Sequence, residues 1–116
     1  MSTTCIALIV PARLSEPVRV ETLDAGLYTL KSLVGGDIES VTRGDWHVYL
    51  NAEGKIINLP PNIRAGHLML EAGLYLVDIF CGTAVFLGNG DHGEEADAPE
   101  HLIRLAERLF DTPLAA

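Results

Sequence analysis

The sequence has few cysteines, few basic residues and no hydrophobic run long enough for a membrane. Its two cysteines, Cys5 and Cys81, both stand in apolar runs, which is typical of small buried residues rather than of a disulfide framework. A reducing cytoplasm is the simplest setting for such a pair. The longest apolar stretch, residues 74–88, is shorter than the roughly 20 residues needed to span a bilayer, and it carries Asp78. The sequence therefore predicts a cytoplasmic protein without a membrane span.

Basic residues are half as common as acidic ones. Eight Lys and Arg stand against 16 Asp and Glu, which gives a formal net charge of −8. This charge repels phosphate backbones, and no Lys or Arg cluster offsets it locally, so we expect no direct binding to nucleic acid. Solubility is the simpler explanation of the acidity. The alternative is an acidic surface that mimics nucleic acid.

Motifs for catalysis and for metal binding are missing as well. The sequence has no GxSxG elbow, no glycine-rich phosphate loop, and no His or Cys pair at metal-ligand spacing. The densest polar cluster, residues 91–97, offers oxygen ligands, but its spacing differs from an EF-hand loop and a solvated acidic loop is the simpler interpretation. We therefore predict no metal, no cofactor and no enzyme activity. Carboxylates paired by the fold for acid-base chemistry are the alternative that sequence leaves open.

What the sequence does contain is enough apolar material for one core. Hydrophobic residues make up 48% of its 116 residues, and a chain of this size buries about two-thirds of its unfolded surface. We predict a single domain over residues 1–116, with a core at 5–90, an acidic loop at 91–98 and a C-terminal helix at 99–111. The fold class is α+β, with a mainly antiparallel, curled sheet of about five to seven strands, one internal helix and one C-terminal helix.

Local patterns place the first elements. The continuous apolar run at residues 5–10, ended by Pro11, predicts a strand buried on both faces. Alternation at residues 18–21 predicts a second, half-exposed strand. Asp24 is expected to cap a helix that ends at Gly35, because apolar residues recur there at helical spacing and glycine favours the left-handed stop.

The middle of the sequence predicts three antiparallel strands, at residues 38–42, 46–50 and 55–59, with turns at 43–45 and 51–54. The second turn is expected to hold Gly54 in the left-handed region.

Prolines 60 and 61 end this sheet segment, and Asn62 is expected to cap a short turn or helix from Ile63 toward Leu70. Two further strands are predicted at 74–80 and 83–87. A capping box at residues 97–100 then starts the closing helix.

Three residues are candidates for an interaction surface: Trp46, Asn62 and Arg64. Trp46 stands on a predicted strand, while Asn62 and Arg64 follow the diproline. The diproline reduces the disorder of its loop, so polar groups beyond it would be presented rigidly to a partner. The simpler alternatives are that Trp46 belongs to the core and that Asn62 and Arg64 cap and solvate a turn.

Four segments resemble one protein family when they are taken in combination. They are Leu-Val-Gly-Gly-Asp-Ile-Glu at 33–39, Leu-Asn-Ala-Glu-Gly-Lys at 50–55, Leu-Pro-Pro-Asn-Ile-Arg-Ala at 59–65 and Thr-Ala-Val-Phe-Leu-Gly at 83–88. They resemble the family called domain of unknown function 3846, over residues 5–90, with the C-terminal helix as an addition of this chain and Ile63 as a departure from the usual pattern. The resemblance implies a small protein of actinobacteria, their bacteriophages and mobile elements. It carries no catalytic residues.

In that setting, the leading expectation is a non-enzymatic intracellular protein that binds a host or phage protein, through the C-terminal helix or the loop at 62–64. An acidic nucleic-acid mimic that inhibits a DNA-handling enzyme is one alternative, and a small-ligand binder or enzyme is another. An edge strand or an apolar face on the last helix would each support a homodimer, and the sequence does not choose between them.

Overall fold

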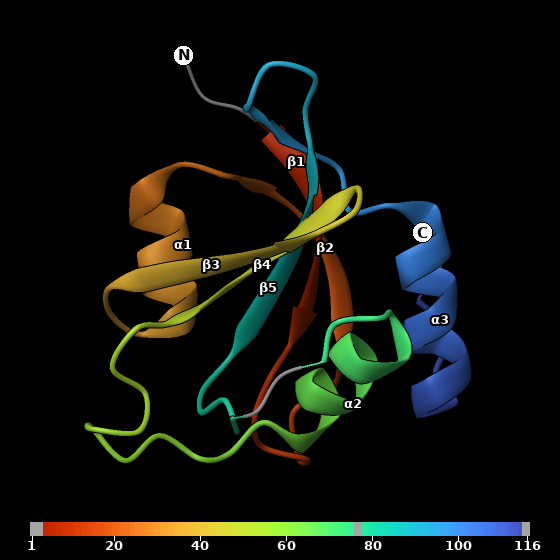
Figure 1. Ribbon diagram of the computed structural model, residues 1–116. Helices are drawn as coiled ribbons and strands as arrows, with labels where there is room; N and C mark the ends of the chain where they lie inside the picture. Colours follow the sequence, from red (N-terminus) through yellow and green to blue (C-terminus); the bar gives the residue numbers. More distant parts are fainter. Residues whose placement is uncertain (1–3, 76–77, 115–116) are drawn as a thin grey trace.

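The computed structural model describes residues 4–75 and 78–114 (Figure 1). The strands are β1 (Thr4–Val10), β2 (Arg19–Asp24), β3 (Ile38–Arg43), β4 (Trp46–Asn51), β5 (Ala84–Asn89) and β6 (Glu95–Ala96). The helices are α1 (Leu27–Val34), α2 (Ile63–Glu71) and α3 (Glu100–Phe110). The predicted α+β class is confirmed, and the short segment after Asn62 forms a full helix, so the described chain has two internal helices rather than one.

The six strands form one open antiparallel sheet in the order β2-β1-β5-β4-β3, with β6 paired to β5. Alternate residues of β1 face opposite sides. Ala7 and Ile9 pack in the cluster that contains α1, whereas Leu8 and Val10 pack in the cluster that contains α2 and α3. The helices therefore cover both faces of the sheet, α1 on one side and α2 with α3 on the other (Figure 1). This confirms that β1 is buried on both faces.

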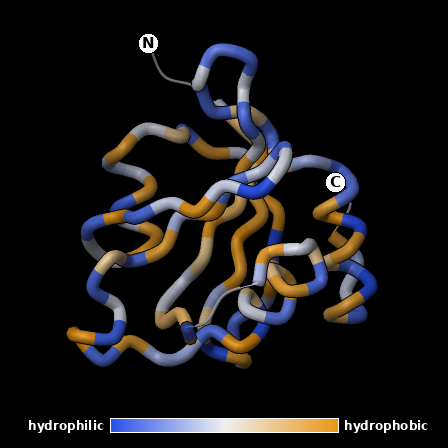
Figure 2. Tube along the Cα trace, in the orientation of Figure 1, coloured by the Kyte–Doolittle hydropathy of each residue, from blue (hydrophilic) through white to orange (hydrophobic). Residues whose placement is uncertain are grey.

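Figure 2 shows the resulting distribution of hydropathy, with hydrophobic residues along the inner strands and hydrophilic ones in the loop that joins β5 to β6. A second hydrophobic segment lies away from the core, at the tip of the loop between β4 and α2.

The strand predicted at residues 55–59 is wrong. This segment forms turns, with Ile57 N bonded to Glu53 O and Leu59 N bonded to Gly54 O. The physical reason is that both edges of β4 are occupied, one by β3 and the other by β5. Gly54 does not take the predicted left-handed conformation. Glycine is needed at this position because a Cβ there would overlap the backbone carbonyl oxygen of Cys81.

The strand predicted at 74–80 is also not formed by its described residues, while residues 76 and 77 lie outside the described part of the chain. Leu74 and Phe80 instead pack against the α2 side of the core, and Asn62 N bonds to Phe80 O at 2.8 Å. The predicted strand at 83–87 is confirmed as β5.

Two helix caps differ from expectation because the acidic side chains bind elsewhere. Asp24 closes β2 and accepts a bond from Gly26 N at 3.0 Å, while Gly26 takes the N-cap position of α1. Asp97 accepts a bond from Ile6 N at 2.7 Å, so Pro99 precedes α3 without a side-chain cap. The C-terminal stop of α1 at Gly35, with φ of 83°, is confirmed. The predicted loop at 91–98 contains the two residues of β6.

Candidate functional site

The three residues singled out from the sequence all have structural partners. Trp46 is 2% exposed, and its ring lies against Phe86 with 5.6 Å between the centroids. It belongs to the core, as the simpler alternative held. Its side chain is therefore not part of any accessible surface.

Asn62 is also 2% exposed. Its Nδ2 donates to Val10 O at 2.8 Å and to Gly82 O at 2.9 Å, and its Oδ1 accepts from Ala65 N at 2.9 Å. The last of these bonds is the predicted N-cap of α2. The first two join α2 to the end of β1 and to the turn before β5. The side chain of Asn62 therefore links three segments that are distant in sequence.

Arg64 is bound to backbone carbonyls of the turn between β1 and β2. Its guanidinium donates to Pro11 O at 2.8 Å, Arg13 O at 2.9 Å and Glu16 O at 2.7 Å. Burial lowers the pKa of Arg64, and the charge of Glu16 opposes that shift. Arg64 thus holds the turn between β1 and β2 in place. It lies in the first turn of α2, the helix that Asn62 caps.

Sequence reasoning missed an exposed apolar surface, which we call the α2 face. It consists of Ile56, Ile63, Leu70 and Ile79, whose side chains are between 49% and 77% exposed. A groove of about 190 Å³ lies between Ile63, Leu70 and Ile79, and a depression of about 220 Å³ beside it is lined by Ile56 and again by Ile79. Because Ile79 lines both, the surface is continuous.

A signal for this surface was present in the sequence of α2. Leu68 and Met69 are buried, while Ile63 and Leu70, which also fit the helical pattern, point outward. A helix that is apolar on both sides needs cover on both sides. The sequence could not show that the segment carrying Ile79 would add to the outer side.

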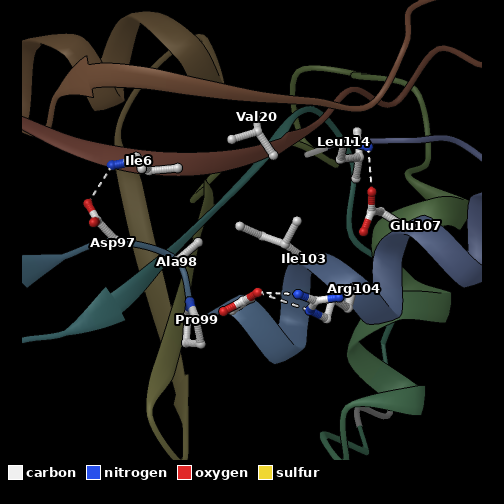
Figure 3. A pocket seen from close by; sticks show the side chains of 10 residues that line it. Ile6, Val20, Asp97, Ala98, Pro99, Ile103, Arg104, Glu107 and Leu114 are labelled. Atoms are coloured by element: carbon white, nitrogen blue, oxygen red, sulfur yellow. Dashed lines mark hydrogen bonds and ion pairs between the residues drawn. The ribbon is translucent and has the colours of Figure 1, made fainter. Parts of the chain in front are cut away.

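A larger cavity, which we call the α3 cleft, lies between α3 and the β1–β2 edge of the sheet (Figure 3). Its volume is about 560 Å³. The apolar walls come from distant parts of the chain: Ile6, Val20, Ala98, Pro99, Ile103 and Leu114. Ala98 N bonds to Ile6 O at 2.8 Å, which fixes the segment before α3 along β1 and so sets the width of the cleft.

Charged groups stand at the rim of the α3 cleft. Arg104 donates from Nε to Glu100 at 3.1 Å, one helical turn away, and the pKa of Arg104 is raised, first by this hydrogen bond and then by the charge of Glu100. Glu107 accepts from Leu114 N at 2.7 Å. Asp97, Glu100 and Glu107 against Arg104 leave the lining with two net negative charges, three minus one.

A third cluster joins β4, β5 and β6. His47 Nε2 lies 2.6 Å from Glu95 Oε1, and the Tyr49 hydroxyl donates to the other oxygen of Glu95. His47 Nδ1 faces Asn89 Oδ1, and Asn89 Nδ2 donates to Gly44 O at 3.0 Å. Burial raises the pKa of Tyr49 well above its ordinary range, and the hydrogen bond to Glu95 and the charge of Glu95 add to the shift.

The bonds of this cluster determine what it can do. Because the amide nitrogen of Asn89 donates to Gly44 O, its oxygen faces Nδ1 of His47. Both ring nitrogens of His47 and both oxygens of Glu95 have protein partners. The bonds of His47 and Tyr49 to Glu95 tie β6 to β4, and these three residues line a depression of about 250 Å³.

The carboxylates of the acidic loop turn in different directions. Glu95 bonds inward to His47, Asp97 bonds to Ile6 N, and Glu94 bonds to His92 N at 3.1 Å. These bonds tie the three carboxylates to different parts of the chain. Within residues 4–75 and 78–114, no group of three or more His, Cys, Asp and Glu side chains is placed to hold a metal ion.

The cysteines do not form a reactive pair. Burial raises the pKa of the Cys5 thiol, with smaller contributions from the charges of Asp97 and Glu95, and a protonated thiol is a poor nucleophile. Both Cys5 and Cys81 are free thiols. Among the helices in the described part of the chain, none has the length and hydrophobicity to cross a membrane.

Comparison with solved structures finds a likeness to the small RNA methyltransferase HEN1, with a TM-score of 0.62 and 14% sequence identity. The alignment covers 91% of this chain but only 16% of that one. At this identity the likeness concerns the fold alone. A search of curated proteins found no match.

A family match covers residues 5–111. It therefore extends through α3, and the expectation that the family-like part ends near residue 90 is wrong. The C-terminal helix and the residues that line the α3 cleft, apart from Leu114, lie within the family's own domain rather than in an addition to it. The chain belongs to the family described as Domain of unknown function (DUF3846).

Proposed function

We propose that this protein acts by binding another protein, without catalysing a reaction, and that the α2 face is the contact surface. The exposure of Ile56, Ile63, Leu70 and Ile79 around two adjoining depressions carries the proposal. Exposed apolar patches of this kind mark sites of protein association. Covering one such side chain completely contributes about 1.5 to 3 kcal/mol, so two or three anchors supply the core of an interface.

The negative charge of the protein indicates which kind of partner would bind. The net charge of −8 opposes association with a second copy and favours a basic protein. Asp78 stands at the edge of both depressions, where it pairs with Lys55. Glu39 and Glu53 also line the second depression and add negative charge beside it. The partner we propose is a host or phage protein that inserts aliphatic or aromatic side chains flanked by Lys or Arg.

The chain offers a matched pair of substitutions to test this surface. Ile63 and Leu27 are the first residues of α2 and α1, they are 66% and 60% exposed, and they lie on opposite sides of the sheet. Asp is favourable at the start of a helix. Ile63→Asp and Leu27→Asp therefore place the same charge in equivalent local settings, and both variants are expected to fold.

The experiment is affinity capture from a nuclease-treated actinobacterial lysate with three baits: wild type, Ile63→Asp and Leu27→Asp. We expect one host protein that wild type and Leu27→Asp retain and that Ile63→Asp loses. Direct titration of that purified protein then gives the change in Kd. Equal retention by Ile63→Asp, or no protein enriched over an empty resin, contradicts the proposal.

A further inference from the structure

We propose that the free edge of β3 pairs with the β3 edge of a second copy of this chain, antiparallel and with Val41 at the two-fold axis. β3 is the last strand on the path β2-β1-β5-β4-β3 (Figure 1), and within the described residues it pairs only with β4. An unpaired strand edge is a template for another strand. This inference concerns the β3 edge and does not depend on the α2 face.

The backbone of β3 shows which of its residues face the free edge. β3 and β4 run antiparallel, and just before β3 the same register continues with a hydrogen bond from Ala52 N to Asp37 O at 2.8 Å. In an antiparallel pair, residues bonded to the partner strand alternate with residues whose N–H and C=O point away from it. The odd-numbered residues of β3 therefore bond to β4. The N–H and C=O groups of Ser40 and Thr42 point to the free edge.

A two-fold axis at Val41 uses these outward groups. It sets Ser40 of each copy opposite Thr42 of the other. Each of these two pairs exchanges two N–H···O bonds, so the backbones of the two copies are joined by four hydrogen bonds. Both residues are exposed, as this pairing requires.

The side chains of β3 favour this position of the axis. Glu39 and Arg43 stand two positions before and after Val41, so the axis places Glu39 of each copy opposite Arg43 of the other. These contacts fall in non-hydrogen-bonded pairs, in which side chains come closest, and all lie on one face of the sheet. An axis at Ser40 would also fit the backbone, but it would set Glu39 opposite Val41. Only the axis at Val41 therefore forms two ion pairs.

The side chains needed for these contacts are available. Glu39 and Arg43 are exposed, and neither belongs to an ion pair within residues 4–75 and 78–114. Val41 is half-buried and packs against the core on the side of α2 and α3. Val41 of a second copy would extend this apolar layer across the interface and remove more of it from water.

Charge distinguishes the two edges of the sheet. The net charge of −8 makes two copies repel each other in most orientations. β3 carries one Glu and one Arg, so its own charges balance. β2, at the opposite edge, carries Glu21 and Asp24 against Arg19, and Arg19 is already paired with Glu21. A second copy therefore meets less repulsion at β3 than at β2.

Exchange of charges between two copies tests the interface. Sedimentation equilibrium of the purified full chain gives its mass over a concentration series, and we expect wild type to rise from 12.5 kDa toward twice that mass. Glu39→Lys sets positive charges opposite each other at both contacts, and Arg43→Glu does the same with negative charges. Each variant should raise the dimer Kd about tenfold or more.

An equal mixture of Glu39→Lys and Arg43→Glu should dimerise again, because the mixed pair has two contacts of opposite charge. This recovery would also show that both variants are folded. Glu21→Lys is the matched control, since it makes the same charge change on an exposed residue of β2. It should not raise the dimer Kd.

Several results would overturn the proposal. They are a wild type that stays at 12.5 kDa, a Glu39→Lys variant that associates as well as wild type, and a mixture that stays monomeric. Amide hydrogen exchange then checks the register, because pairing about Val41 should slow exchange at Ser40 and Thr42 as the concentration rises. A dimer in which exchange at these two amides is unchanged places the interface elsewhere and also contradicts the proposal.

Discussion

Substitution of Asn62 separates a structural role from a binding role, because the two roles predict opposite results. In the structure, all of its interactions are internal: two donated bonds to Val10 O and Gly82 O and one accepted bond from Ala65 N. The side chain is 2% exposed. We therefore expect Asn62→Ala to destabilise the protein strongly, and any loss of partner binding to follow from unfolding.

The size of the effect follows from these three bonds. Each contributes about 0.5 to 1.5 kcal/mol net, and a carbonyl left buried without a donor adds to the loss. Asn62→Ala should therefore lower the free energy of unfolding by about 2 to 4 kcal/mol. Asn62→Ser keeps an oxygen for the N-cap and should lose less, since only the bonds to Val10 O and Gly82 O are removed.

Asn62→Asp adds a dependence on pH. The new carboxyl faces two carbonyl oxygens in a buried site, and both burial and these oxygens favour its protonated form, so its folded-state pKa is raised above the unfolded value of about 3.9. Stability relative to wild type is then retained below about pH 3.9 and is lost as pH rises through the folded-state pKa. The deficit of Asn62→Asp should be larger at pH 7 than at pH 4.

Urea unfolding followed by tryptophan fluorescence provides the assay. Trp46 is the single tryptophan, and it is buried in the core, so its emission reports global unfolding. An Asn62→Ala variant that stays within about 0.5 kcal/mol of wild type, the range for surface substitutions, yet loses its partner would refute the structural role. It would restore Asn62 to the interaction surface that the sequence suggested.

Three further predictions concern the tertiary contacts. Gly88→Ala should cost about 1 to 3 kcal/mol in urea unfolding, because its Cβ would overlap the Asp97 carbonyl oxygen; a cost below that range would contradict this packing. Gly66→Ala should instead stabilise α2 by about 0.5 to 1 kcal/mol, since nothing lies within 4 Å of the added Cβ, and a lower unfolding midpoint would disprove it. Between pH 9 and pH 11 wild type should lose more stability than Tyr49→Phe. The folded-state pKa of Tyr49 lies above the unfolded-state value of about 10, so stability is lost as pH rises past the unfolded-state value. Equal losses in the two proteins would exclude a buried, hydrogen-bonded phenol.

Many elements followed from local sequence. The hairpin of β3 and β4 has the predicted strands and turns at Gly44, which takes a φ of 61°, and α1 ends at the predicted glycine. The N-cap role of Asn62 was also expected. These features depend on residues that are close in sequence, so side-chain period and glycine placement were sufficient.

The failures share one cause, which is competition between segments distant in sequence. Residues 55–59 had a strand-like pattern, but β5 occupies the edge of β4 with which they would have paired. Gly88 of β5 pairs with Trp46 there. Asp97 stands in a pattern typical of a helix cap, but its carboxylate accepts a hydrogen bond from Ile6 N, 91 residues away. Local propensity cannot rank such partners, because the outcome depends on which strand edges and backbone donors the fold leaves open.

The sequence by itself determined the α+β class, the two-sided burial of β1, the boundaries of several elements and the excess of negative charge. Only the tertiary structure decided that Trp46 and Asn62 are buried, that Ile79 joins Ile63 and Leu70 on the α2 face, and that Ile6, Val20 and Ile103 line one cleft. The physical reason is that a surface or a cavity is made by side chains from several elements. Its shape and charge arise only when packing sets those elements side by side.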